Sequence, residues 1–289
     1  MNNSAAMSRR LRGELRRLRL VGGRTQREVA EALEWSPSKV IRIENGQVGL
    51  SVTDLRALLA YYDVTDQAVV GELAKLARSS KPKLFGRYRG ELPADTIKYF
   101  EYEAAASAIR SFELLVVPGL LQIESYTSTL LEVYGTPDGL REAIFATRHD
   151  RQHLLMQKQA PKAHFIVDEQ ALLRPVGGPA VMREQLQHLL AAAKRPNITI
   201  QVLPLARGAH VGLQGTFTIL EFGDSDDADV LYLEGRAGAD RTYVGEWTAA
   251  DSHRKAFAAL ASMAEPPSAF ASYVMQALAS LDTSGGSPH

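Results

Sequence analysis

The sequence predicts two domains: an all-α N-terminal domain of five short helices, and an α+β C-terminal domain with a small mixed sheet. The chain has 289 residues, which is enough for two domains of ordinary size. Over residues 9–78, apolar side chains recur at spacings of three and four, and residues that cap or stop helices separate the segments. After residue 101, helical patterns alternate with short runs rich in Val, Ile, Phe and Tyr, which are typical of strands.

The helices of the first domain follow from their apolar faces and their ends. The first helix carries leucines at helical spacing, with arginines on its other faces: Leu11, Leu15 and Leu18. A Gly-Gly pair ends it. Thr25 and Glu28 have the spacing of a capping box and start the second helix. Ser36 followed by Pro37 marks the start of the third helix.

The remaining elements are predicted from the same patterns. The apolar side of the third helix is assigned to Val40, Ile41 and Ile43, and two further helices are expected near 51–62 and 66–78. Helices of the second domain are expected at 101–110, 124–134, 137–157, 178–194, 248–263 and 267–281. Strands are expected at 164–167, 198–203, 216–222, 230–234 and 242–244. The strand–helix–strand run predicts a parallel crossover, and the later strands predict hairpins.

Breaks in composition set the expected boundaries. We expect a flexible N-terminus at 1–8, the first domain at 9–78, a linker at 79–100, the second domain at 101–281 and a disordered tail at 282–289. Cysteine is absent, which excludes disulfides and thiolate metal sites. No apolar run is long enough to cross a membrane, and the arginine-rich start lacks the apolar stretch of a signal peptide. The expected location is the cytoplasm, associated with the nucleoid.

The charge is distributed unevenly along the chain. Lys+Arg and Asp+Glu both number 33, so the formal net charge is zero. Residues 1–100 hold 18 basic and 11 acidic side chains, a net charge of +7. Residues 101–289 hold 15 basic and 22 acidic side chains, a net charge of −7. This asymmetry indicates an anionic partner, such as nucleic acid or a membrane surface, for the first part alone.

The second and third helices, with the turn at Glu34 and Trp35, resemble the helix-turn-helix of phage-repressor-like, Xre-type DNA-binding domains over about residues 9–65. In that family the third helix enters the major groove of double-stranded DNA. The sequence departs from the family at Arg24, where an apolar residue is usual, and at Glu34-Trp35, which replace a Gly–apolar pair. The resemblance also implies a structural ion pair between Arg19 and Glu44.

Residue chemistry indicates which side chains contact DNA. Gln26 and Ser36 stand at helix N-termini, where phosphate binds well. Candidate base readers share one face of the third helix, and Arg42 is the first choice because arginine bonds guanine: Ser38, Lys39 and Arg42. Further candidates for phosphate contacts are Arg24, Arg27 and Asn45. Because one such module contacts few base pairs, we expect a homodimer on a pseudo-palindromic site.

Residues of about 95–280 resemble the uncharacterised domain of actinomycete WhiJ-like regulators. The resemblance rests on several motifs in order: Val117-Pro118-Gly119-Leu120-Leu121-Gln122, Leu173-Arg174-Pro175-Val176-Gly177-Gly178, Ile200-Gln201-Val202-Leu203-Pro204 and Phe217-Thr218-Ile219-Leu220-Glu221-Phe222. It implies a transcriptional regulator whose C-terminal domain senses a ligand or a partner, such as a small protein encoded nearby. The alternative is an antitoxin-like interaction module that binds DNA mainly for autoregulation.

Enzymatic function is not expected. The sequence has no P-loop, dinucleotide fingerprint, nucleophile elbow or zinc-protease motif, and we expect no cofactor. His149 and His153 have metal-binding spacing, but an exposed helix face explains them better. The acidic stretch of residues 221–234 lacks the pattern of a calcium loop, so no metal site is expected there either. His210, in the glycine-containing loop 208–212, and Glu221 are candidates for a pocket or partner site. For His210, an exposed side chain in a tight connection between two strands is the favoured alternative.

Overall fold

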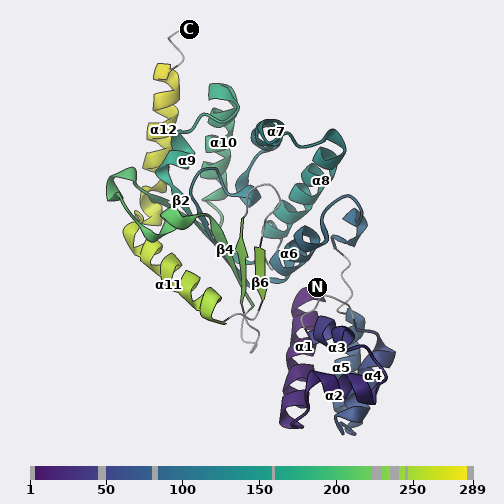
Figure 1. Cartoon of the computed structure of the whole chain (residues 1–289). Helices are drawn as coiled ribbons and strands as arrows, with labels where there is room; N and C mark the ends of the chain where they lie inside the picture. The colour runs from purple at the N-terminus through teal and green to yellow at the C-terminus, as the bar shows by residue number, and fades with distance from the viewer. Residues whose placement is uncertain are drawn as a thin grey trace.

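The computed structural model describes residues 4–44, 50–79, 84–157, 160–222, 229–234, 241–244 and 247–284. Within these residues, the N-terminal part consists of five helices, as predicted (Figure 1). They are α1 (Ser4–Val21), α2 (Gln26–Ala32), α3 (Pro37–Glu44), α4 (Val52–Tyr61) and α5 (Gln67–Ser79). Asn45, one of the expected DNA contacts, lies outside the described residues.

One apolar cluster holds these helices together. It joins Leu15 of α1 to Val29 of α2, Val40 of α3 and Leu58 of α4, all of which are buried. The predicted apolar spacing therefore identifies Leu11, Leu15 and Val40 of this core. The assignment of Ile41 to the same side of α3 is wrong, because Ile41 is 40% exposed. Positions 40 and 43 lie one helical turn apart and face inward, whereas position 41 is rotated away from them.

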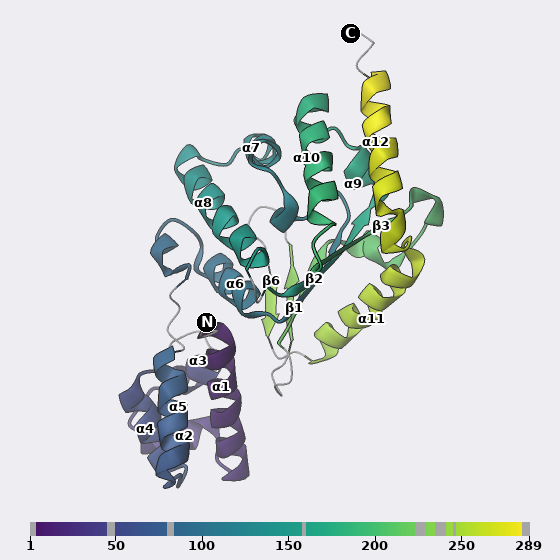
Figure 2. The same cartoon turned by 180° about the vertical axis from the view of Figure 1, so that it is seen from behind.

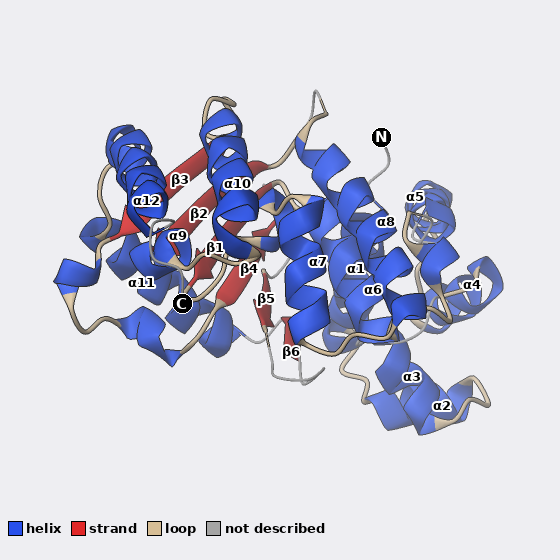
Figure 3. Cartoon of the chain, turned by 90° about the horizontal axis from the view of Figure 1, so that it is seen from above, coloured by secondary structure: helices blue, strands red, loops and turns tan. Residues whose placement is uncertain are grey.

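The C-terminal part is built on a six-stranded mixed sheet in the order β3-β2-β1-β4-β5-β6 (Figure 3). The strands are β1 (Ala108–Glu113), β2 (Lys162–Asp168), β3 (Ile198–Leu203), β4 (Phe217–Glu221), β5 (Val230–Leu233) and β6 (Arg241–Val244). Strands β1, β2 and β3 are parallel, and β4, β5 and β6 continue antiparallel. The predicted parallel pair and the predicted antiparallel pairing of the later strands are confirmed.

Helices cover both faces of the sheet (Figure 2). They are α6 (Ala94–Ala105), α7 (Glu124–Val133), α8 (Asp138–Leu155), α9 (Glu169–Leu173), α10 (Gly178–Ala192), α11 (Trp247–Met263) and α12 (Phe270–Ser284). Helices α6, α8, α10 and α12 share an apolar cluster with one face, and α11 packs on the other through Phe257 and Leu260. Among the described helices, none has the length and apolar character needed to cross a membrane.

The central strand β1 departs from the sequence prediction, which continued a helix to residue 110. Helix α6 ends at Ala105, and the chain becomes extended at Ala106. Strand β1 is mostly buried, with Ile109 and Phe112 in the apolar clusters of opposite faces. A strand buried on both sides lacks the polar–apolar alternation that identifies a half-exposed strand. The helical prediction for 108–110 is therefore wrong.

The segment expected as a linker contributes to the C-terminal core. Phe85 and Tyr88 are buried in the same cluster as α6, and α6 itself begins at Ala94. Phe85 packs edge-on against Phe100 at a centroid distance of 5.5 Å. The aromatic side chains of residues 84–100 thus pack in the C-terminal core. The polar residues just before them had led to the prediction of a linker.

The two parts of the chain meet at α1 and α6 (Figure 2). Arg12 Nη2 of α1 donates a hydrogen bond of 3.4 Å to the hydroxyl of Tyr102 on α6. Tyr102 is otherwise buried in the C-terminal core. This contact ties the first helix of the N-terminal part to the first helix of the C-terminal part.

Candidate nucleic-acid interface

The start of α2 is fixed by its capping box. The backbone N–H of Glu28 donates to Thr25 Oγ1 at 3.2 Å, and the backbone N–H of Thr25 donates to Glu28 Oε2 at 2.7 Å. The bond from the Thr25 backbone holds the pKa of the Glu28 carboxyl below its ordinary value, because it stabilises the charged form. The N-terminus of α2 is thereby held in a defined position, as contact with a phosphate requires.

The turn between α2 and α3 has an unusual backbone conformation. Glu34 adopts a φ of 55°, in the left-handed region. An ordinary side chain costs about 1–2 kcal/mol there, whereas glycine, which the resembled family usually has, adopts it freely. The backbone N–H of Trp35 donates to the carbonyl of Ala30 at 2.8 Å, closing the turn. The sharp turn is thus formed without glycine.

Arg19 and Glu44 form a buried, bidentate ion pair that joins α1 to α3. Arg19 Nε lies 2.7 Å from Glu44 Oε1, and Nη2 lies 3.0 Å from Oε2. Their side chains are only 9% and 5% exposed. Gln26 Nε2 donates to Glu44 Oε2 at 2.8 Å, so the first residue of α2 joins the same network. The hydrogen bond to Glu44 raises the pKa of Arg19 above its ordinary value. The network therefore fixes three helices relative to one another.

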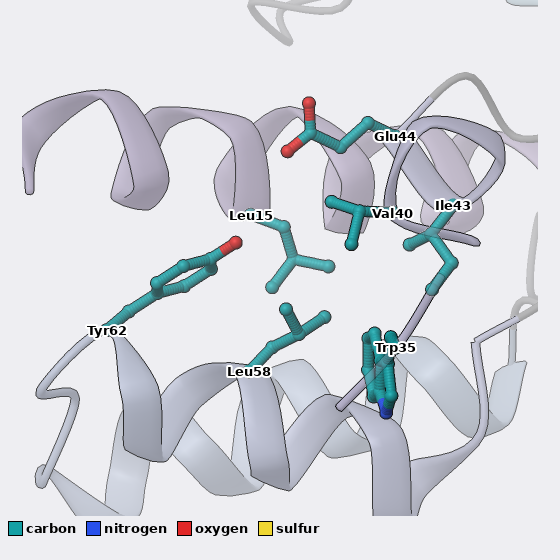
Figure 4. A pocket seen from close by; sticks show the side chains of 7 residues that line it. All are labelled: Leu15, Trp35, Val40, Ile43, Glu44, Leu58 and Tyr62. Carbon is teal, nitrogen blue, oxygen red and sulfur yellow. The ribbon is translucent and has the colours of Figure 1, made fainter. Parts of the chain in front are cut away.

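A small pocket lies beside this network, between α1, α3 and α4 (Figure 4). Its lining residues are Leu15, Trp35, Val40, Ile43, Glu44, Leu58 and Tyr62. Burial raises the pKa of Tyr62 to about 12, so its hydroxyl stays neutral at ordinary pH. The lining is mainly apolar, and the pocket is a hollow of the core rather than a site for an anion.

Lys39, expected as a base reader, is instead engaged by its own domain. Its Nζ lies 3.0 Å from Asp54 Oδ1 and 3.6 Å from the centre of the Trp35 ring. Trp35 itself packs against the apolar cluster. The structure therefore separates Lys39 from Ser38 and Arg42, with which the sequence analysis grouped it.

The solvent-exposed surface of α3 is formed by other residues. Ser36 and Ser38 are exposed, and their Oγ atoms lie 3.1 Å apart. Arg42 is exposed and its Nε donates to the carbonyl of Ser38 at 3.2 Å. Ile41, which the sequence analysis placed in the core, shares this exposed side. These four residues form what we call the α3 surface.

The two arginines near α2 that were expected to contact phosphate differ in their surroundings. Arg24 Nη2 pairs with Asp63 at 2.7 Å, and its guanidinium lies 4.4 Å from the centre of the Tyr61 ring. Arg27 is 82% exposed and pairs with Glu31, one helical turn along α2. Arg24 therefore contacts the end of α4, whereas the side chain of Arg27 is exposed to solvent.

The C-terminal candidates lie at opposite edges of the sheet. His210 Nε2 lies 3.5 Å from Asp168 Oδ2, at the carboxyl end of β2, and both side chains are 4% exposed. Glu221 pairs in register with Ala108, the first residue of β1, and its carboxylate lies 2.7 Å from Arg110 Nε. The structure does not bring His210 and Glu221 together. Burial raises the pKa of Asp168 above its ordinary value.

A buried polar network that the sequence analysis did not identify surrounds Gln122. Arg148 Nη1 donates to Gly119 O at 2.6 Å and to Gln122 Oε1 at 2.9 Å, and Gln122 Nε2 donates to Val117 O at 2.7 Å. Burial lowers the pKa of Arg148 to about 10. These bonds fix the Pro-Gly turn, so this motif has a structural role. No local pattern of the sequence distinguishes Arg148 from other helical arginines.

Glu113, at the carboxyl end of β1, is a second buried group, and it predicts a pH dependence. Burial raises its pKa to about 8, and it accepts a hydrogen bond from Ser111 at 2.8 Å. The folded protein therefore keeps a proton that the unfolded chain releases near 4.5, the ordinary pKa of a glutamate. Because the folded state binds more protons in this window, stability is full below about pH 4.5 and falls as pH rises towards about 8, by at most about 1.4 kcal/mol per pH unit.

Replacing Glu113 by glutamine should remove this slope, since glutamine keeps an acceptor for Ser111 but does not titrate. The measurement is the midpoint of thermal unfolding of both proteins between pH 5 and 8. Parallel profiles for the natural protein and Glu113→Gln would contradict the assignment.

The metal alternatives find no support in the part of the chain that the structure describes. No group of three or more His, Asp or Glu side chains there could hold a metal ion. In the acidic stretch, Asp229 forms an ion pair with Arg254. Asp224, Asp226 and Asp227 lie outside the described residues.

The five-helix arrangement and its fixed turn define a helix-turn-helix protein, and residues 10–73 match the helix-turn-helix domain family. This match indicates a DNA-binding regulator. Residues 96–275 match a domain of unknown function, DUF5753, and the chain belongs to this family. Comparison with curated proteins and with solved structures returns no match.

Proposed function

We propose that the protein is a sequence-specific transcriptional regulator that binds double-stranded DNA as a homodimer and senses a ligand or partner protein through its C-terminal domain. The resemblance to Xre-type and WhiJ-like regulators supports this proposal, as does the net charge of +7 over residues 1–100. The opposite charge of the remaining residues, −7, keeps the C-terminal domain from competing for the same phosphates.

The observation that carries the DNA-binding part is the rigid presentation of the α3 surface. Arg42 and Ser38 are exposed on one side of α3, while the Arg19–Glu44 pair and Gln26 hold the opposite side against α1 and α2. Arginine in the major groove bonds the N7 and O6 atoms of guanine. A rigid helix holds such a guanidinium where it can reach the base edges. Binding then does not carry the entropic cost of ordering the helix.

The sensing part is supported by apolar side chains beside the buried His210–Asp168 contact. Leu205, Val211 and Leu213 follow β3 and are 51%, 39% and 57% exposed. Three exposed apolar side chains within one short segment favour a protein or ligand contact over a purely solvated segment. A small protein encoded nearby is the partner we propose first.

Binding to genomic fragments at increasing salt tests the proposal. The expected result is tight binding to a few fragments and weak binding to the rest, with affinity falling steeply as salt rises because phosphate contacts release counterions. Half-sites should lie about 34 Å apart, one turn of DNA, and the protein should sediment as a dimer on them. Equal affinity for all fragments, or affinity that does not respond to salt, would refute sequence-specific binding.

A further inference from the structure

One apolar side chain stands among the polar residues of the α3 surface. Ile41 is 40% exposed, whereas its neighbours Val40 and Ile43 are 2% and 3% exposed. An isolated exposed isoleucine needs no special explanation on an ordinary surface. Here it lies on the side of the helix that a helix-turn-helix protein turns towards DNA.

The position of Ile41 follows from helix geometry. Residues three and four apart lie on the same side of a helix, so Ser38, Ile41 and Arg42 form one continuous group. The bond from Arg42 Nε to the carbonyl of Ser38 connects the two polar members of this group. Ile41 therefore borders the residues best placed to bond base edges.

The contacts of Lys39 reduce the number of cationic groups that the α3 surface presents to solvent. Its ammonium group is held by Asp54 and by the ring of Trp35, away from Ser38 and Arg42. The recognition chemistry of α3 is thus one guanidinium, small hydroxyls and one branched apolar side chain. With a single cation, this surface can form fewer hydrogen bonds to base edges than a surface with two cations. Ile41 can form an apolar contact with a base beside the one that Arg42 bonds.

The major groove offers one apolar group, the C5-methyl of thymine. We infer that Ile41 packs against a thymine methyl, so that α3 selects a thymine next to the guanine bonded by Arg42. This inference rests on the proposed DNA binding and specifies which bases are read. An exposed isoleucine increases the affinity for DNA by burying its methyl groups against the thymine methyl. Cytosine lacks this methyl group, so the contact distinguishes the two bases.

Removal of single methyl groups from DNA tests the inference. The full-length protein first selects its binding sequence from random duplexes, and each thymine of that sequence is then replaced by deoxyuridine. At one thymine in each half-site, deoxyuridine should weaken binding about fourfold, the effect of losing one buried methyl-sized contact. Ile41→Ala should bind the natural sequence more weakly and lose this sensitivity. Its unfolding midpoint should stay unchanged, because the side chain is exposed.

Val69→Ala is the matched control, since Val69 is 37% exposed and lies on α5, away from α2, α3 and the turn between them. It should keep the full response to deoxyuridine. Insensitivity of the natural protein to every substitution, or an equal response in Ile41→Ala, overturns the thymine contact while leaving DNA binding intact. Loss of dimer formation in Ile41→Ala, without a change in methyl sensitivity, also overturns it and assigns Ile41 to an interface between copies. Failure to select any sequence overturns the proposed function itself.

Discussion

Replacing Arg19 by alanine should destabilise the N-terminal domain by about 3–5 kcal/mol, the usual effect of removing one partner from a buried ion pair. The side chains of Arg19 and Glu44 are 9% and 5% exposed, so Glu44 would lose its charged partner at a site with little access to water. Gln26 would remain as a neutral donor to Glu44, which is too weak a substitute for a guanidinium. Thermal or denaturant unfolding followed by far-UV circular dichroism measures the loss.

Two variants separate this effect from a general effect of charge. Arg17→Ala removes an arginine from the same helix, but Arg17 is 59% exposed and pairs with Glu14 at the surface, so the unfolding midpoint should not move. Arg19→Met combined with Glu44→Leu removes both charges and should recover part of the lost stability. If Arg19→Ala and Arg17→Ala unfold at the same temperature, the pair does not hold the helices together.

Arg42→Ala should weaken sequence discrimination and leave the fold intact. Loss of a guanidinium that bonds guanine lowers the affinity for the selected sequence by about 1–3 kcal/mol, and affinity for random DNA changes little. Stability should be unaffected, because Arg42 is exposed and its Nε donates to the carbonyl of Ser38 within its own helix. Titration of selected and random duplexes at one fixed salt concentration measures both affinities.

Arg16→Ala is the control for this variant, since Arg16 is an exposed arginine on α1. It removes the same charge from the same domain and should keep the ratio between selected and random affinities. An unchanged ratio in Arg42→Ala would show that Arg42 does not read a base.

The fold of the N-terminal part was predictable because local rules determine it. The capping box at Thr25 and Glu28 and the buried leucines on successive turns each act within a few residues. The central strand β1 was not predictable in this way. Its burial depends on helices that approach from both faces, and these come from distant parts of the chain.

The sequence predicted which helix forms the candidate site, but it did not predict the surroundings of every residue on that helix. Spacing alone placed Lys39 with Arg42, whereas Asp54 of α4 holds its ammonium group elsewhere. Ile41 was assigned to the core because it is apolar, but the rotation of α3 is set by the contacts of Val40 and Ile43. The contacts of Lys39 and the exposure of Ile41 both depend on tertiary packing, which a local sequence pattern does not contain.

The contact between α1 and α6 also has a consequence for experiments on separate fragments. Arg12 and Arg19 are seven residues apart, which is about two helical turns and about 10.5 Å along the axis. The same side of one rigid helix therefore meets Tyr102 of α6 and holds Glu44 of α3. A cut between the two halves of the chain would divide a shared surface and expose the hydroxyl of Tyr102 to water. In an isolated N-terminal fragment, α1 would therefore lack a contact that it makes within the whole chain.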